Sequence, residues 1–129
     1  MVTALRVLIG LVGIFNLVLG VGFLVEPTKL GNAFFLSPTG TLGLATLRGD
    51  FPGFFIGASL FAIYGACHVR ADALLVPLVL LTIADAGRVI SLIVDGAPST
   101  AFPPMIAEWI MIALLLTGYQ VFGRAKLTR

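Results

Sequence analysis

The sequence of 129 residues has few charged side chains, a single cysteine and a single histidine. Charged residues make up 11% of the chain, against about a quarter in soluble domains, whereas hydrophobic residues make up 59%. This balance excludes an ordinary soluble domain and predicts one integral membrane domain over residues 1–129. Cys67 has no second cysteine with which to form an internal disulfide.

The signatures of metal, cofactor and phosphate sites are missing as well. His68 has no second histidine or cysteine pair near it, so we expect no zinc or haem site and no cofactor. The sequence has no glycine-rich phosphate loop, no Gly-x-Ser-x-Gly turn and no Cys-x-x-Cys pair, and nucleophilic catalysis by serine or cysteine has no support. The net charge of +2 includes a basic tail that is too short to predict nucleic-acid binding.

Four long hydrophobic runs are what the sequence does contain. Each is about long enough to cross a hydrocarbon core of roughly 30 Å at about 1.5 Å per helical residue. The runs cover Val7 to Val25, Phe51 to Cys67, Ala73 to Val94 and Phe102 to Phe122. We therefore expect an all-α fold, a bundle of four transmembrane helices surrounded by the lipid bilayer.

Positive charges predict the orientation of this bundle. An even number of spans puts both termini on one side of the membrane, and an excess of Lys and Arg marks the cytoplasmic side. The termini and the loop between the second and third helices carry Arg6, Arg70, Arg124, Lys126 and Arg129. The opposite side carries only Lys29 and Arg48. We expect cytoplasmic termini in a multi-pass protein of the cell inner membrane.

The segment between the first two helices mixes turn residues with large apolar ones. From Gly31 to Leu47 it contains glycines and a proline beside Phe34, Phe35 and several leucines. This composition is typical of an interfacial loop or short helix that covers the outer end of a bundle. The sequence leaves open whether the segment moves as a lid.

Small residues recur along the second helix. Gly53, Gly57 and Gly65 follow one another in steps of four and eight. Rows of this kind let the backbones of two membrane helices approach closely. We expect the row to serve helix packing, with Gly53 and Gly57 also available for contact with a second copy or a larger membrane complex.

Charged residues gather toward the outer end of the third and fourth helices. Asp85, Arg88 and Asp95 fall on nearly one face of the third helix. Glu108, in the fourth helix, lies at a depth similar to that of Arg88, so we expect a salt bridge between them. Charges at membrane depth are costly, and this cluster is where function should be sought.

Helices one and two add further polar groups. Arg48 and Asp50 stand where the second helix enters from the outer side, and Asn16 lies mid-membrane, where it needs a hydrogen-bond partner. A single outer-side site could contain five charged residues: Arg48, Asp50, Arg88, Asp95 and Glu108. Closely spaced carboxylates beside an arginine have separated pKa values, which supplies an acid and a base near neutral pH.

A structural role is the alternative for each of these residues. Arg88 with Asp85 or Glu108 could be an ion pair that fixes helix register, and Asp50 and Asp95 could be boundary residues in contact with water. For Arg88 and Glu108 we favour a functional role, because apolar residues would be cheaper at those positions in so small a bundle.

Two segments and one acid carry a family resemblance. They are Leu47 to Gly53, Gly87 to Ser99 and Glu108, and the most specific part is the Gly-Arg…Asp-Gly-x-Pro stretch across the third helix and its turn. In these features the chain resembles the bacterial membrane family catalogued as domain of unknown function 4345, over most of its length. The resemblance implies a four-helix fold and supplies no activity.

Two classes of function follow from the residues. The first is an intramembrane hydrolase or isomerase that acts on a lipophilic small molecule entering from the bilayer. Glu108 or Asp95 would be the general acid or base, and Arg88 or Arg48 would stabilise developing negative charge. The groups suit epoxide opening or double-bond isomerisation. We place this class first because the acids and arginines come from several helices at similar depth.

The second class is a non-catalytic membrane protein. It would be an accessory subunit of a larger complex, or a small proton-coupled carrier with Asp85 as the mid-membrane acid. Four short helices without an evident inverted repeat argue against the carrier. For the subunit Gly53 and Gly57 would matter more than Glu108, and for the enzyme the reverse would hold.

Overall fold

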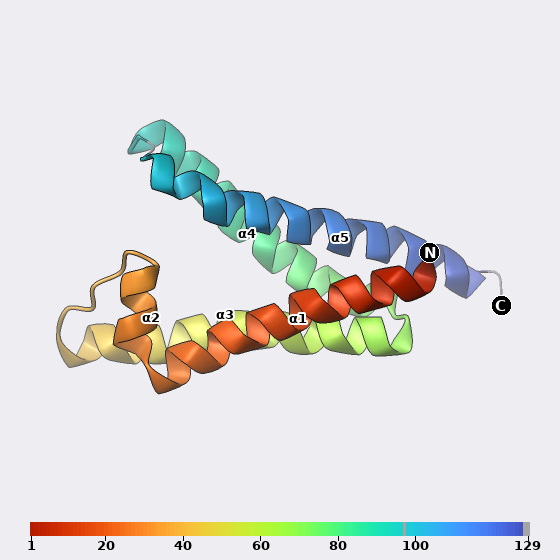
Figure 1. Ribbon diagram of the computed structural model, residues 1–129, viewed down its shortest axis with the longest axis horizontal. Helices are drawn as coiled ribbons and strands as arrows, with labels where there is room; N and C mark the ends of the chain where they lie inside the picture. Colours follow the sequence, from red (N-terminus) through yellow and green to blue (C-terminus); the bar gives the residue numbers. More distant parts are fainter. Residues whose placement is uncertain (97, 128–129) are drawn as a thin grey trace.

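The structure is a computed structural model that describes residues 1–96 and 98–127; Ala97 and Arg129, both used above, lie outside the described residues. Across them the chain forms α1 (Val2–Val25), α2 (Pro27–Ala33), α3 (Gly40–His68), α4 (Ala71–Val94), a 3-10 turn η1 (Ser99–Ala101) and α5 (Phe102–Leu127) (Figure 1). The predicted all-α fold is confirmed, because every element formed by the described residues is helical. Four helices, α1, α3, α4 and α5, are long and apolar enough to cross a membrane. The chain is therefore a multi-pass membrane protein.

The four long helices form two antiparallel pairs. The packing of α1 against α3 is the most extensive in the molecule, and α4 packs mainly against α5. We call these pairs the α1/α3 arm and the α4/α5 arm. The arms meet at the end that carries the N-terminus and the last turns of α5, and they diverge toward the other end (Figure 1). We call these the narrow end and the wide end.

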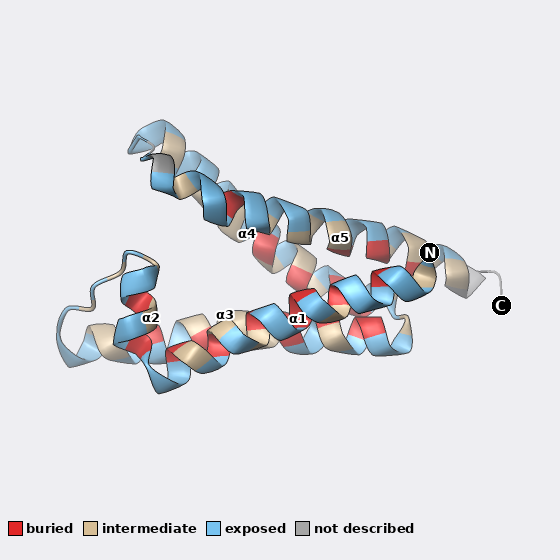
Figure 2. Ribbon diagram, viewed as in Figure 1, coloured by how far each residue is buried: buried red, intermediate tan, exposed pale blue. Residues whose placement is uncertain are grey.

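The apolar core lies where the arms meet. A cluster of buried side chains joins all four long helices, and buried segments appear on the facing sides of the ribbons (Figure 2). Its members are Leu5, Ile9, Val12, Ala62, Ala66, Leu74, Leu81, Leu115 and Phe122. Toward the wide end the α4/α5 arm is mostly exposed (Figure 2).

Glycines of α1 allow the close contact within the α1/α3 arm, whereas Gly53 and Gly57 of α3 do not take part in it. A Cβ added to Gly13 would lie 2.5 Å from Ile63 Cγ1, and one added to Gly20 would lie 2.5 Å from Ile56 Cγ1. A Cβ on Gly53 or Gly57 would meet nothing within 4 Å. The expected packing role within the bundle is therefore wrong for Gly53 and Gly57. It is confirmed for Gly65, where an added Cβ would lie 2.5 Å from Leu74 Cδ2.

Helix boundaries differ most at the start of α3. The sequence predicted a helix from Phe51, whereas α3 begins at Gly40 and continues through Pro52. Membrane helices tolerate an internal proline, because neighbouring groups satisfy the carbonyl that it leaves free. The start of α5 at Phe102 is as predicted, with two prolines in a first turn whose missing donors cost little.

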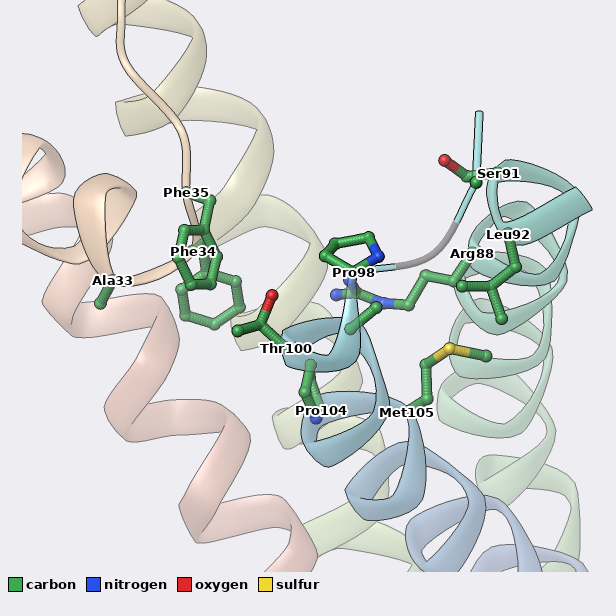
Figure 3. Close-up of a pocket in the computed structure, with 12 residues that line it drawn as sticks. Ala33, Phe34, Phe35, Arg88, Ser91, Leu92, Pro98, Thr100, Pro104 and Met105 are labelled. Atoms are coloured by element: carbon green, nitrogen blue, oxygen red, sulfur yellow. The ribbon is translucent and has the colours of Figure 1, made fainter. Parts of the chain in front are cut away.

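The segment from Gly31 to Leu47 is more ordered than a loop. Helix α2 ends at Ala33, Phe35 follows in the turn with a φ of 59°, and α3 begins at Gly40. A Cβ added to Gly31 would lie 3.0 Å from the side chain of Leu47, which shows how closely α2 lies on α3. The segment therefore belongs to the α1/α3 arm at the wide end and places Phe34 and Phe35 near the space between the arms (Figures 1 and 3).

Candidate functional site

An ion pair between Arg88 of α4 and Glu108 of α5 is the centre of the candidate site. The Nε of Arg88 donates to both carboxylate oxygens of Glu108, at 3.2 Å to Oε1 and 3.0 Å to Oε2. The Glu108 side chain is 13% exposed and that of Arg88 is 39% exposed. The salt bridge expected from their similar depth is present, and it joins the two helices of the α4/α5 arm.

One turn closer to the narrow end, Asp85 accepts a hydrogen bond from Trp109. The indole Nε1 lies 2.8 Å from Asp85 Oδ2 and again joins α4 to α5. The other oxygen, Oδ1, is buried and receives no hydrogen bond from the described residues. Sequence reasoning missed Trp109, although an indole N–H inside a membrane needs an acceptor and Trp109 directly follows Glu108.

Asp50 brings a second carboxylate to the site from the other arm. It lines a cavity of about 270 Å³ that Arg88 and Glu108 also line. The remaining lining is apolar and mostly aromatic: Phe34, Phe51, Phe54, Phe55 and Ala84. Phe23 supports this aromatic surface from α1, with its ring centroid 4.7 Å from that of Phe51. Three charged residues therefore face a phenylalanine surface between the two arms.

A larger cavity, of about 620 Å³, lies beside the first. Arg88 and Phe34 line both cavities, so the two are neighbours. Its further lining comes from the end of α2, the outer part of α4, and the turn and first residues of α5 (Figure 3). The polar side chains among the lining residues are those of Arg88, Ser91 and Thr100.

The structure does not bring Arg48 and Asp95 into this site. Arg48 lines a separate hollow with Glu26 and Lys29 on the α1/α3 arm. Asp95 is exposed at the end of α4, where its Oδ2 accepts a hydrogen bond of 2.7 Å from Ser91 Oγ. Neither residue lines the two cavities described above. The expected group of five charged residues is therefore reduced to Asp50, Arg88 and Glu108.

Asn16 lies away from the site, in the contact between α1 and α5. Its Nδ2 donates to the carbonyl of Val12 at 2.8 Å and to Met111 Sδ at 3.6 Å. Its Oδ1 is buried and has no partner among the described residues, as is also true of Ser59 Oγ. Asn16 thus reaches a neighbouring helix as expected, but through a weak acceptor.

The narrow end carries its own polar contacts. Arg6 donates to the carbonyls of Ala66 at 2.9 Å and Cys67 at 3.0 Å, which satisfies the last turn of α3. Arg70 is paired with Asp72 at the start of α4, and these hydrogen bonds raise the pKa of Arg70 above its ordinary value. Among the described residues, no three His, Cys, Asp or Glu side chains are grouped closely enough to hold a metal ion.

The arrangement offers general acid/base chemistry on an apolar molecule. Two carboxyl groups approach one cavity from different arms, and a guanidinium stands beside one of them. A carboxylate can accept a proton, a carboxylic acid can donate one, and a guanidinium stabilises negative charge on oxygen. The phenylalanine surface would hold the apolar part of a bound molecule.

Comparison with known proteins gives one match. A family model described as Domain of unknown function (DUF4345) matches residues 4–119. That range contains Asp50, Arg88 and Glu108 together with both cavities. No curated protein and no solved structure matches the chain.

Proposed function

The chain belongs to the DUF4345 family, whose description assigns no activity, and from its own site we propose that it binds a lipophilic small molecule between the arms and acts on it by acid/base chemistry. One observation carries the proposal: Asp50, Arg88 and Glu108, from both arms, line one cavity whose other surface is phenylalanine. Charged groups are costly within a membrane bundle, and a purely structural ion pair would not need a third charge from the opposite arm.

Epoxide opening is one reaction that suits these groups. One carboxylate takes a proton from water while the water oxygen forms a bond to an epoxide carbon. The ring carbon–oxygen bond breaks, and the other carboxyl group, in its acid form, delivers a proton to the ring oxygen. Arg88 donates hydrogen bonds to that oxygen as it gains negative charge. The product is a diol.

Double-bond isomerisation would use the same residues without water. One carboxylate removes a proton from the carbon next to the double bond, the double bond shifts toward that carbon, and a carboxylic acid returns a proton to the far carbon of the original double bond. The apolar surface of Phe51, Phe54 and Phe55 would keep the hydrocarbon in place between Asp50 and Glu108. Both reactions predict loss of activity on removing either carboxylate.

The orientation of the chain is part of the proposal. Arg6, Arg70 and Arg124 belong to the narrow end, and an excess of positive charge marks the cytoplasmic side. The narrow end would then lie in the cytoplasm with both termini, and the cavities would open in the outer half of the cell inner membrane. A lipophilic molecule could enter between the diverging arms directly from the bilayer.

Native mass spectrometry with lipid extraction tests the binding part. We compare the unmodified protein with Asp50→Asn, Glu108→Gln and the double variant Arg88→Gln/Glu108→Gln, and use Lys29→Gln as a control at the wide end. A small lipophile should accompany the unmodified protein and Lys29→Gln, and should be reduced in the site variants. Retention of the same lipids by every variant would contradict the proposal.

Isotope labelling tests the chemistry on the extracted lipophile or on simple long-chain epoxides and alkenes. Epoxide opening incorporates heavy oxygen from labelled water, and isomerisation incorporates deuterium from heavy water. The unmodified protein should produce one of the two labelled products, and Asp50→Asn and Glu108→Gln should each reduce its rate by at least about a hundredfold. Equal rates in the two carboxyl variants and the unmodified protein would exclude the assigned roles.

A second candidate function, that of an accessory subunit, is favoured by the glycines of α3. Gly49, Gly53 and Gly57 recur every fourth residue, and a Cβ on any of them would meet nothing within 4 Å. The same spacing leads to Phe61, which is 45% exposed. Another chain's helix could approach this side closely. Gly53→Leu/Gly57→Leu should then abolish co-purification of a larger complex, while the isolated chain stays folded because the added side chains meet open space.

A further inference from the structure

Arg88 uses only part of its hydrogen-bonding capacity. Its Nε is directed at Glu108, and among the described residues no acceptor reaches its two terminal amino groups. These N–H groups are therefore free to donate hydrogen bonds to a molecule bound beside them. From this geometry we infer that the larger cavity binds the oxyanion head of an amphiphilic molecule, such as a carboxylate, on the terminal amino groups of Arg88. The inference rests on the proposed function and specifies its substrate class.

The charge of the larger cavity favours an anion. Among the described residues that line it, only Arg88 is charged, whereas Asp50 and Glu108 line the smaller cavity. Asp95 lies nearby but lines neither cavity, and Ser91 directs its hydroxyl proton toward it. No carboxylate among the described residues that line the larger cavity therefore competes with a bound anion for the guanidinium. A planar guanidinium with two free amino groups matches the two oxygens of a carboxylate.

The shape of the site supports the same assignment. The Arg88 side chain extends from α4 across the cavity toward the side where Pro98, Thr100 and Phe34 lie (Figure 3). Thr100 has no hydrogen-bond partner among the described residues, so its hydroxyl is available to a second head-group oxygen. A volume of about 620 Å³ falls within the usual range of small-molecule sites.

Continuity between the cavities orients the bound molecule. Phe34 and Arg88 line both, so a head on Arg88 leaves the attached hydrocarbon beside Phe34, next to the smaller cavity with Phe54 and Phe55. Asp50 and Glu108 also line that smaller cavity. The oxyanion head would therefore be held apart from the carbon atoms on which the two carboxyl groups act.

Quenching of Trp109 fluorescence tests the inference. Trp109 is the sole tryptophan and directly follows Glu108. The full chain in phosphatidylcholine nanodiscs is titrated with a medium-chain ω-bromo fatty acid and, in parallel, with the matched ω-bromo alcohol, since bromine quenches nearby indoles. Charge-assisted hydrogen bonds should make the apparent dissociation constant of the acid about ten- to a hundredfold lower than that of the alcohol.

Variants identify the group responsible for this preference. Arg88→Gln/Glu108→Gln removes the pair without leaving an unpaired charge, and it should make acid and alcohol equal. Lys29→Gln, which changes a charge outside both cavities, should keep the preference for the acid. Repeating the titration in phosphatidylglycerol nanodiscs separates two sources of the oxyanion, because competition there would show that bilayer phosphate lipids occupy the same head site.

The outcomes separate this inference from the proposed function. Equal saturable binding of acid and alcohol by the unmodified protein would overturn the oxyanion assignment and leave a site for neutral lipophiles. A preference for the acid that persists in Arg88→Gln/Glu108→Gln would also overturn it. If neither compound quenches Trp109 more in the unmodified protein than in the double variant, the lipophile site and the oxyanion assignment both fail.

Discussion

Breaking the Arg88–Glu108 ion pair should destabilise the protein by an amount that its burial determines. Truncating one partner of a fully buried pair costs about 3 to 5 kcal/mol, whereas a fully exposed pair contributes about 0 to 1 kcal/mol. The exposures of 13% for Glu108 and 39% for Arg88 lie between these limits. We expect Arg88→Gln to lower the free energy of unfolding by about 2 kcal/mol, because it leaves the more buried charge unpaired.

The reverse substitution should cost less. Glu108→Gln leaves a guanidinium that is more exposed and can contact water, so we expect a loss of about 1 kcal/mol. The double variant should recover part of the sum, with a coupling free energy of about 1 to 2 kcal/mol. The assay is reversible unfolding in mixed micelles, followed by Trp109 fluorescence and by circular dichroism.

The more exposed pair of Arg70 and Asp72 provides the matched control. Both side chains are about half exposed, at 46% and 59%, so a cycle of Arg70→Gln and Asp72→Asn should show a coupling close to zero. A coupling close to zero for Arg88 and Glu108 as well would refute the reasoning, because the two charges would then not depend on each other in the folded protein.

Four further substitutions test packing and buried hydrogen bonds. Gly13→Ala should lower the stability of the protein by about 1 to 3 kcal/mol, because the new Cβ collides with Ile63 and approaches the α3 backbone at 3.3 Å. Gly53→Ala should stabilise α3 slightly, because its new Cβ would meet nothing within 4 Å. Equal losses of stability in the two variants on thermal unfolding would contradict this contrast. Asn16→Leu should raise the free energy of unfolding by about 1 kcal/mol, since Asn16 Oδ1 is buried without a partner among the described residues. A marked loss of stability in the same assay would mean that the Asn16 side chain makes a stronger hydrogen bond than this. Trp109→Phe should remove the donor to Asp85 Oδ2, beside an Oδ1 that is already buried without a partner among the described residues, and should cost about 1 to 3 kcal/mol, measured by circular dichroism. Unchanged stability would exclude that hydrogen bond.

The helices and the central ion pair could be predicted from the sequence because each depends on local or nearly local pattern. The four hydrophobic runs fix which segments cross the membrane. The match in depth between Arg88 and Glu108 follows from their distances to the helix ends, and the structure has the pair at 3.0 Å. The early start of α3 was missed because Arg48, Asp50 and Pro52 together resemble a helix boundary.

The arrangement of the arms depends on contacts that no single segment specifies. Whether a glycine packs depends on which side of its helix faces a neighbour, so Gly13 and Gly53 look equivalent in the sequence and differ in the structure. Arg48 and Asp50 are two residues apart on α3, and only Asp50 lines a cavity with Arg88. The divergence of the arms, which creates the cavities, is a property of the whole bundle (Figure 1).

Photolabelling is the most direct test of a lipophile site between the arms. A long-chain diazirine fatty acid is activated on the protein in nanodiscs, and the labelled peptides are mapped with and without an excess of unlabelled fatty acid. The account predicts that competitor removes label from the segments around Phe34, Phe54 and Met105, which line the cavities, and leaves label on lipid-facing residues such as Phe15. Uniform labelling of all exposed apolar residues, insensitive to competitor, would contradict the account.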